Sequence, residues 1–300
     1  MSSFRTISPT DTTSAVFHSY LLGVVAPRPI AFASTVDSQG KVNLSPFSFF
    51  NVFGSNPPIL IFSPSRRVRD NTIKHTLENV QEVKEVVINI VNYAMVQQMS
   101  LASCEYEKGV NEFIKAGFSE EPSILVKPPR VKEAPAAFEC RVNQIIATGT
   151  EGGAGNLVIC EILLAHIQED IINAKNQIDP QKLDAVARMG NDWYCRAYGD
   201  AIFSVPKPNQ KKGIGFDNIP AQIRYSTVLT GNDLGMLGNI EALPTKEEIS
   251  EFTSQSAIQE IVTNKHNSLA VKEALHQIAK AYLLEGKVKE AWLTLLQEGK

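Results

Sequence analysis

The chain has 300 residues, of which 43% are hydrophobic and 20% are charged, and its formal net charge is −3. These values predict a folded protein with a substantial core and exclude wholesale disorder. There is no basic block that could neutralise a run of phosphates, so we expect no nucleic-acid partner. The N-terminal segment lacks the apolar region of a secretory signal, and no stretch approaches the roughly 20 apolar residues of a membrane helix. We therefore expect a cytoplasmic protein without a membrane partner.

Cysteine and histidine spacing gives no support for a metal site. The cysteines stand at positions 104, 140, 160 and 195 without a CxxC pair, and the five histidines show neither HxxxH nor HExxH spacing. Isolated cysteines of this kind commonly serve as small buried hydrophobes. We expect no bound metal.

The first part of the chain is predicted to be strand. Apolar and β-branched residues indicate strands over 29–36 and 42–53, joined by a hairpin loop at 37–40, and a third strand over 59–63. Pro46 interrupts the second strand and cannot donate to a ladder, so it marks a bulge or a sheet edge.

Helices are inserted next. The expected elements are a helix over 71–84, a strand over 86–91, and helices over 94–103 and 110–115. Asn71 or Thr72 is the expected N-cap of the first helix, and Gly117 is expected to close the last one.

A glycine-rich run at 149–155 lies between two long predicted strands, 138–148 and 157–168. A dinucleotide fingerprint opens a helix, whereas a strand follows here, so the run is predicted to be a hairpin turn. Short hairpin connections favour an antiparallel barrel over a doubly wound parallel sheet.

The character of the sequence changes near Pro244. Thr245 with Glu248 makes a capping box, and the residues beyond are rich in Ala, Leu, Glu and Lys. We expect a barrel domain over 1–240 and a C-terminal α-helical extension over 241–300, packing on the barrel or on a partner.

Three segments could carry chemistry. From Ser63 to Thr76, three arginines are followed by hydroxyl and amide side chains at a helix start, which is either a phosphate cradle or a solvated basic loop with an ordinary cap. The segment 43–51 places Pro46 between aromatics, which suits either a backbone opened to a flat ring or a core strand with an edge bulge. The segment 188–194 is a tight turn with two aromatics and indicates little alone.

In this order, the segments resemble the flavin-reductase-like family with the FMN-binding split-barrel fold, in its flavoredoxin-type branch. The matching stretches are PRPIAFASTVDSQGKVNLSPFSFFN (27–51), RDNTIKHTLENVQEVKEVVINI (69–90), EKGVNEFIKAGF (107–118), GNLVICEI (155–162) and RMGNDWY (188–194). The resemblance covers about residues 20–235. It implies a mainly β protein, an antiparallel, Greek-key-like split barrel with helices; the expected C-terminal helical extension lies outside the matched region.

The resemblance also implies which residues hold FMN. Those along the isoalloxazine ring and ribityl chain would be Ala33, Ser34 and Thr35. Those touching the ring and the ribityl–phosphate end would be Ser45, Pro46, Phe47 and Ser48. Those holding the phosphate would be Asn71, Thr72, Lys74 and Thr76, with Arg67 or Arg69 close by and Ser63 at the start of the same segment. Those near the flavin or the substrate pocket would be Asn156 and Tyr194.

The activity implied by the resemblance is an NAD(P)H-dependent flavin reductase, with NAD(P)H as electron donor and a protein, free flavin or ferric iron as acceptor. An FMN-binding electron-transfer protein without its own NAD(P)H turnover is the alternative, and a flavin-free interaction scaffold is a third. A homodimer with the flavin near the subunit boundary is expected. Because the flavin carries the redox chemistry, no catalytic side chain is expected.

Overall fold

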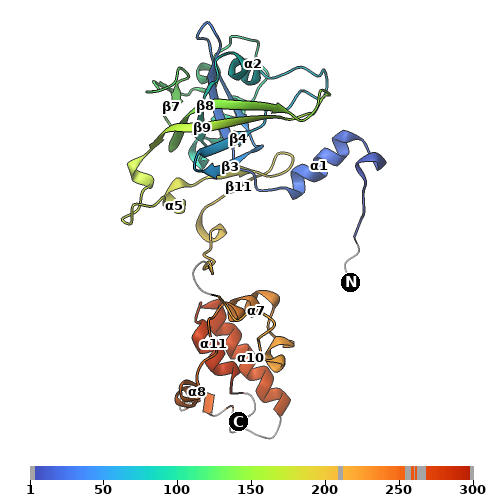
Figure 1. The fold of residues 1–300 in the computed structure, drawn as a ribbon, viewed down its shortest axis with the longest axis vertical. Helices are drawn as coiled ribbons and strands as arrows, with labels where there is room; N and C mark the ends of the chain where they lie inside the picture. The colour runs from blue at the N-terminus through green and yellow to red at the C-terminus, as the bar shows by residue number, and fades with distance from the viewer. Residues whose placement is uncertain (1–3, 209–211, 254–257, 260, 262–267, 298–300) are drawn as a thin grey trace. The chain divides into compact units, whose positions relative to one another are not determined.

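The computed structural model describes residues 4–208, 212–253, 258–259, 261 and 268–297, and the chain divides into two compact units, Met1–Phe203 and Ser204–Lys300 (Figure 1). This boundary lies earlier than the expected one between 240 and 241. The reason is that residues of the 214–240 region, Ile219, Ile223 and Leu237 among them, pack in one core with the C-terminal helices.

The first unit is built on one seven-stranded sheet in the order β2-β1-β5-β8-β9-β4-β3, and every ladder in it is antiparallel. The strands are β1 (Ala31–Val36), β2 (Val42–Phe47), β3 (Phe50–Ser55), β4 (Pro58–Phe62), β5 (Glu85–Ile90), β8 (Ala136–Ala147) and β9 (Asn156–Ile167). Two small pairs accompany it, β6 (Glu120–Glu121) with β7 (Arg130–Val131), and β10 (Val186–Arg188) with β11 (Tyr194–Arg196).

The sheet closes on itself along an unpaired seam. Its two edge strands, β2 and β3, are consecutive in the chain and are separated by Ser48 and Phe49 alone. Three Cα–Cα steps reach roughly 11 Å at most, so the two edges of the sheet must come close together. The sheet therefore curls into a barrel whose seam lies at Ser48 and Phe49.

Helices cover the barrel. The helices of this unit are α1 (Ser14–Val24), α2 (His75–Glu82), α3 (Val96–Leu101), α4 (Glu112–Ala116) and α5 (Pro180–Leu183), with short 3₁₀ turns at Pro9–Asp11, Tyr93–Met95, Glu169–Ile171 and Gly199–Ala201. One core joins Leu77 and Val80 of α2 to side chains of the sheet such as Ala31 and Ala33. A second core joins Phe32 to residues of α3 and α4. Both faces of β1 are thus buried, as its alternate side chains enter different cores.

The antiparallel barrel and the hairpin at the glycine-rich run are confirmed, since β8 and β9 pair on either side of 148–155. Pro46 lies in an edge strand, which is one of the two places expected for it. The predicted strand 42–53 is in fact two strands on opposite edges of the sheet. The closing of α4 at Gly117, in the left-handed conformation, is confirmed.

The expected N-cap of the helix over 71–84 is wrong. The helix begins at His75, and Lys74 is its N-cap without a side-chain cap bond. Asn71 has φ +58°, and the carboxylate of Asp70 accepts from the Thr72 amide at 3.1 Å, so these residues form a turn before the helix.

The second unit is helical. It contains α6 (Ala221–Arg224), α7 (Gly231–Gly238), α8 (Lys246–Thr253), α10 (Ser268–Leu284) and α11 (Val288–Leu295). Trp292 is fully buried at its centre, and its indole donates to the Leu237 carbonyl at 3.0 Å. The capping box is confirmed: the Thr245 amide donates to Glu248 at 2.9 Å, and the Glu248 amide donates to the Thr245 hydroxyl at 3.3 Å. Across the described residues, we find no helix with the length and apolarity needed to cross a membrane.

Candidate functional site

Two cavities meet at the barrel seam, where they share Ser48, Phe49 and Ser63. The first, which we name the cationic pocket, has a volume of about 460 Å³. Its lining residues are Ser45, Pro46, Phe47, Ser48, Phe49, Ser63, Ser65, Arg66, Arg67, Val68, Arg69, Lys74, Ser103 and Glu105. The second, the apolar pocket, has about 540 Å³. It is lined by Val24, Val25, Ala26, Pro27, Arg28, Pro29, Ser48, Phe49, Phe50, Asn51, Phe53, Ile61, Ser63 and Leu157.

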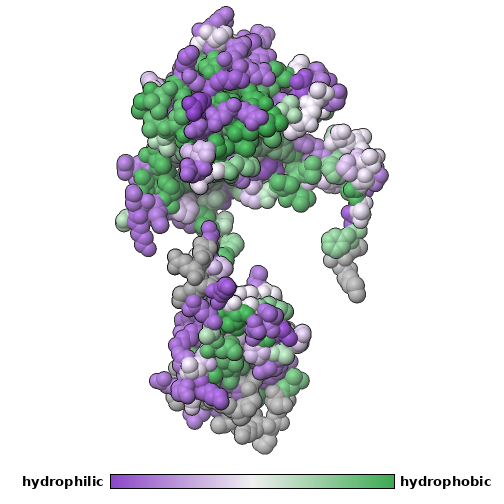
Figure 2. All heavy atoms as spheres, in the orientation of Figure 1, coloured by the Kyte–Doolittle hydropathy of each residue, from purple (hydrophilic) through white to green (hydrophobic). Residues whose placement is uncertain are grey.

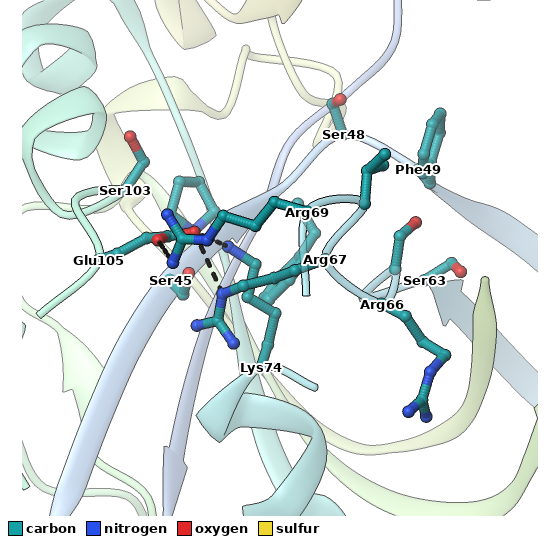
Figure 3. Close-up of a pocket in the computed structure, with 14 residues that line it drawn as sticks. Ser45, Ser48, Phe49, Ser63, Arg66, Arg67, Arg69, Lys74, Ser103 and Glu105 are labelled. Carbon is teal, nitrogen blue, oxygen red and sulfur yellow. Dashed lines mark hydrogen bonds and ion pairs between the residues drawn. The ribbon is translucent and has the colours of Figure 1, made fainter. Parts of the chain in front are cut away.

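The loop from Ser63 to Lys74, which we name the cationic loop, supplies the charge of the first pocket. Arg66 is turned away from the other cations (Figure 3), and its guanidinium donates to the side chain and the carbonyl of Asn71 at 2.5 and 2.7 Å. Arg67 donates to the Thr72 hydroxyl at 2.9 Å and to the Ile73 carbonyl at 2.7 Å. Arg66 therefore stabilises the loop, and Arg67 lines the pocket while the Thr72 hydroxyl and the Ile73 carbonyl hold its guanidinium.

The glycine-rich hairpin is hydrogen-bonded to the backbone of the cationic loop. The amide of Gly153 donates to the Arg66 carbonyl at 3.1 Å, and the amide of Arg66 donates to the Ala154 carbonyl at 2.9 Å. A Cβ at Gly152 would lie 2.9 Å from the Val68 carbonyl oxygen, closer than side chains pack. Glycine is thus required here by the close approach of two backbones.

Three cations meet one carboxylate in the cationic pocket. Arg67 Nε lies 3.1 Å, Arg69 Nη2 2.5 Å and Lys74 Nζ 3.9 Å from the oxygens of Glu105 (Figure 3). Partial burial, and then the neighbouring Arg67, lower the pKa of Lys74 from its ordinary value. The hydrogen bond from Arg67 lowers the pKa of Glu105. The cations therefore favour the charged form of Glu105, while burial first and the neighbouring arginine second disfavour the charged form of Lys74.

The apolar pocket lies between the end of α1 and strands β3 and β4. Arg28 fixes this end of the helix: its guanidinium donates to the Leu22 carbonyl at 2.7 Å, to the Val25 carbonyl, and to the Met189 carbonyl at 2.6 Å. A cation suits a helix C-terminus because the last carbonyls lack partners within the helix. The arrangement joins α1 to the 188–194 turn beside the pocket.

Half of the predicted site residues line the cationic pocket: Ser45, Pro46, Phe47, Ser48, Ser63, Arg67, Arg69 and Lys74. The other half do not line it. Ala33, Ser34 and Thr35 are fully buried in β1, and the Thr35 hydroxyl accepts from Asn79 at 3.0 Å. Any contact of these three with a ligand stays a prediction.

Most of the remaining predicted site residues make hydrogen bonds within the protein that stabilise the fold. The Thr76 hydroxyl is buried and accepts from Asn43 at 2.8 Å. Asn71 donates to the Thr150 carbonyl at 3.0 Å, and Asn156 donates to the Pro64 carbonyl at 2.9 Å. Thr72 donates to Asp70 at 2.6 Å. Asn71, Thr72 and Asn156 thus hold the cationic loop in place, and Thr76 joins α2 to β2, without lining the cavity.

Tyr194 lies elsewhere, in a third cavity of about 330 Å³ that also includes Tyr93, Arg188 and Arg196. The Arg188 guanidinium stacks on the Tyr194 ring at 4.6 Å from its centroid. Asn191 has φ +50°, so asparagine adopts the positive φ of the 188–194 turn.

Sequence reasoning missed several residues of the cationic pocket, chiefly Phe49, Ser103 and Glu105. Phe49 stood inside a predicted strand, whereas it lies at the seam between two. Glu105 follows α3 and is more than thirty residues from the arginines it contacts. The run of arginines predicts a nearby anion, but no local sequence pattern indicates which carboxylate lies next to them.

The family model of the flavin reductase like domain matches residues 25–179, just over half of the chain. The chain belongs to this family. A protein of Aquifex aeolicus without an assigned function is 35% identical over 195 residues, which is 65% of this chain and 97% of that protein.

Two solved structures show how the fold compares. Nitrilotriacetate monooxygenase component B from Bacillus cereus superposes with a TM-score of 0.64 at 26% identity, over 68% of this chain and 100% of that one. A Shewanella frigidimarina protein with a split barrel domain, assigned as a flavin reductase, superposes with a TM-score of 0.57 at 24% identity, over 68% of this chain and all of that one. The seamed barrel of this family member is thus a split barrel.

Proposed function

We propose that this protein binds FMN across the barrel seam and acts as an NAD(P)H-dependent flavin reductase. The observation that carries the proposal is the meeting of a cationic and an apolar pocket at Ser48, Phe49 and Ser63. A flat apolar ring system joined to one phosphate fits a site with these two ends. The family membership supports a flavin as the ligand.

The chain's own residues bind and shield this ligand. Arg67 and Lys74 offer charge-assisted hydrogen bonds to a phosphate, and Arg69 adds charge at the rim of the pocket. Phe49, Phe50 and Val25 line the apolar pocket and would exclude water from the ring. When bound, FMN would supply the redox chemistry, namely hydride acceptance from NAD(P)H and electron transfer to an acceptor.

The apolar pocket's described lining includes no carboxylate, histidine or cysteine. Side chains there can position the ring and keep water out, but they offer no group that titrates near neutral pH. This composition agrees with a site in which the ligand performs the chemistry. The acceptor is then a protein, free flavin or ferric iron that takes electrons from the ring.

The decisive test is anaerobic mixing of the FMN-loaded protein with NADH or NADPH while flavin absorbance is followed. We expect bleaching with at least one nucleotide and recovery on admission of an acceptor. Protein that binds FMN but is bleached by neither nucleotide would be an electron-transfer flavoprotein of the alternative kind. Protein that takes up no FMN would contradict both.

We also propose that two copies of the chain associate through α1 and β3. The side chains of Val16, Leu21 and Val24 on α1 are exposed, as are Val52 and Phe53 on the edge strand β3. Figure 2 shows apolar side chains where α1 leaves the barrel. Val24 and Phe53 line the apolar pocket, so a second copy covering them would also enclose the ring.

Light scattering after size exclusion tests this association, and the expected mass is that of two chains. Val52→Asp places a charge on the proposed interface outside both pockets and should shift the mass toward one chain. A wild-type mass of one chain across the accessible concentration range would refute it.

A further inference from the structure

Among the described residues that line the cationic pocket, Glu105 alone has an acidic side chain. It lies on the loop that follows α3. Its two carboxylate oxygens face Arg67 Nε at 3.1 Å, Arg69 Nη2 at 2.5 Å and Lys74 Nζ at 3.9 Å. The Glu105 side chain is 39% exposed, so solvent reaches it. All three cations that would hold a phosphate therefore already contact one carboxylate, which is exposed enough to move away when another anion binds.

The cations keep other supports that do not depend on Glu105. Arg67 is held by the Thr72 hydroxyl and the Ile73 carbonyl, and Arg69 by Asp70 at 3.0 Å. Lys74 is the N-cap residue of α2, and the start of that helix fixes its backbone. The cations would thus stay in place if the carboxylate moved away.

We infer that Glu105 sets the affinity and selectivity of the site, because its carboxylate competes with the phosphate of the flavin for Arg67, Arg69 and Lys74. This inference rests on the proposed function. A phosphate has up to two negative charges and three acceptor oxygens, whereas the carboxylate has one charge and two. The phosphate can therefore replace Glu105, but its net gain is reduced by the ion pairs that must break.

The consequence is a site that exchanges its flavin. A ligand that lacks the phosphate leaves the Glu105 ion pairs intact, so the carboxylate does not change its affinity, and Glu105 narrows the preference of the site for FMN over riboflavin. A ligand with a full phosphate binds, but less tightly than three bare cations would allow. Glu105 thereby favours a flavin that enters and leaves as a substrate over one that is permanently held.

The test compares Glu105→Gln with Glu107→Gln. Both variants remove one negative charge from the same loop, but Glu107 is exposed and lies outside the pocket lining. Flavin fluorescence titrations with FMN and with riboflavin, which lacks the phosphate, give the dissociation constants. We expect Glu105→Gln to bind FMN at least fivefold more tightly than wild type, with riboflavin affinity within twofold, and Glu107→Gln to match wild type for both.

Inorganic phosphate provides a readout that needs no flavin. We expect it to raise the melting temperature of Glu105→Gln more than that of wild type or Glu107→Gln, because the three cations then lack their carboxylate. Equal or weaker FMN binding by Glu105→Gln, with no added response to phosphate, would overturn the inference and make Glu105 a group that organises the cations. If wild type binds no FMN, the proposed function fails, and the phosphate experiment still decides whether Glu105 competes for an anion.

Discussion

The cationic pocket and the apolar pocket at the barrel seam are assembled in different ways. The charge of the cationic pocket comes mostly from one contiguous stretch, Ser63 to Lys74, whereas the apolar pocket draws on α1, β3, β4 and β9. Charge is visible in a sequence as a cluster, but an apolar cavity exists only where separate elements leave space between them. Under the proposed function the two pockets predict different selectivity: the cationic pocket would recognise a phosphate, and the apolar pocket would recognise a ring whether or not a phosphate is attached.

The largest expected effect is on the cationic end. Arg67→Ala combined with Lys74→Ala removes two charge-assisted contacts, and we expect FMN to bind about 100-fold more weakly, about 2.8 kcal/mol. Riboflavin affinity should change less than twofold. The control is Lys127→Ala with Lys132→Ala, which removes the same charge outside both pockets. Equal losses for the two flavins would contradict the assignment of the phosphate to this end.

Thr76→Ala tests whether Thr76 stabilises the fold around the cationic pocket or contacts the ligand directly. Loss of the buried hydroxyl leaves the Asn43 amide without its acceptor, so we expect a loss of about 1–3 kcal/mol in the free energy of unfolding. Urea denaturation measures it, and Thr76→Ser should retain most of the stability. FMN affinity should stay within twofold of wild type. A tenfold loss of affinity at unchanged stability would instead make Thr76 a phosphate ligand.

Gly152→Ala tests the support behind the cationic loop. The new methyl would meet the carbonyls of Val68 and Arg67, so the loop must shift, and we expect FMN to bind about tenfold more weakly, about 1.4 kcal/mol. Gly149→Ala is the matched control, since a Cβ there meets only the Ala154 methyl at 3.4 Å. The idea fails if both variants bind FMN equally well.

Phe49→Ala probes the point where the pockets meet. The ring is 39% exposed and lines both cavities, so its loss should weaken FMN and riboflavin alike, by about 1 kcal/mol or roughly fivefold. Ile114→Ala, at an exposed apolar site outside both pockets, serves as the control. An effect on FMN without one on riboflavin would place the ring away from Phe49.

The smallest expected effect is on pH dependence. Burial lowers the pKa of Lys74 in the free protein, and a bound phosphate would raise it by favouring the charged form. The contribution of Lys74 is therefore complete below the pKa of the free protein, which lies below the ordinary 10.5, and is lost as pH rises from there to the higher pKa of the complex. Fluorescence titrations should show FMN affinity falling a few-fold on the alkaline side. Lys74→Arg should move that fall to higher pH, since arginine stays charged. A fall unchanged in this variant would mean that another group titrates.

The predicted elements succeeded where the pattern is local. The hairpin at the glycine-rich run follows from a strand on each side of it, and the end of α4 follows from Gly117 at positive φ. The N-cap of α2 failed because Asn71 and Thr72 have the right side chains for a cap but are drawn into bonds with Thr150 and Asp70. The boundary between the two compact units lies earlier in the chain than the expected domain boundary, because the core around Trp292 collects residues from separate segments.

For the candidate site, the sequence by itself determined that a cationic stretch from Ser63 to Lys74 follows a strand and that a separate segment is broken by Pro46. The residue order along the chain is enough for this, because a charge cluster and a strand break at a proline depend only on residues close in sequence. Only the tertiary structure decided which side chains face the cavity, since Ser34 and Thr76 are buried whereas Lys74 and Glu105 line it. The reason is that the seam exists only when the two edges of one sheet meet, and that closure brings together Phe49, the arginines and a carboxylate distant in the chain.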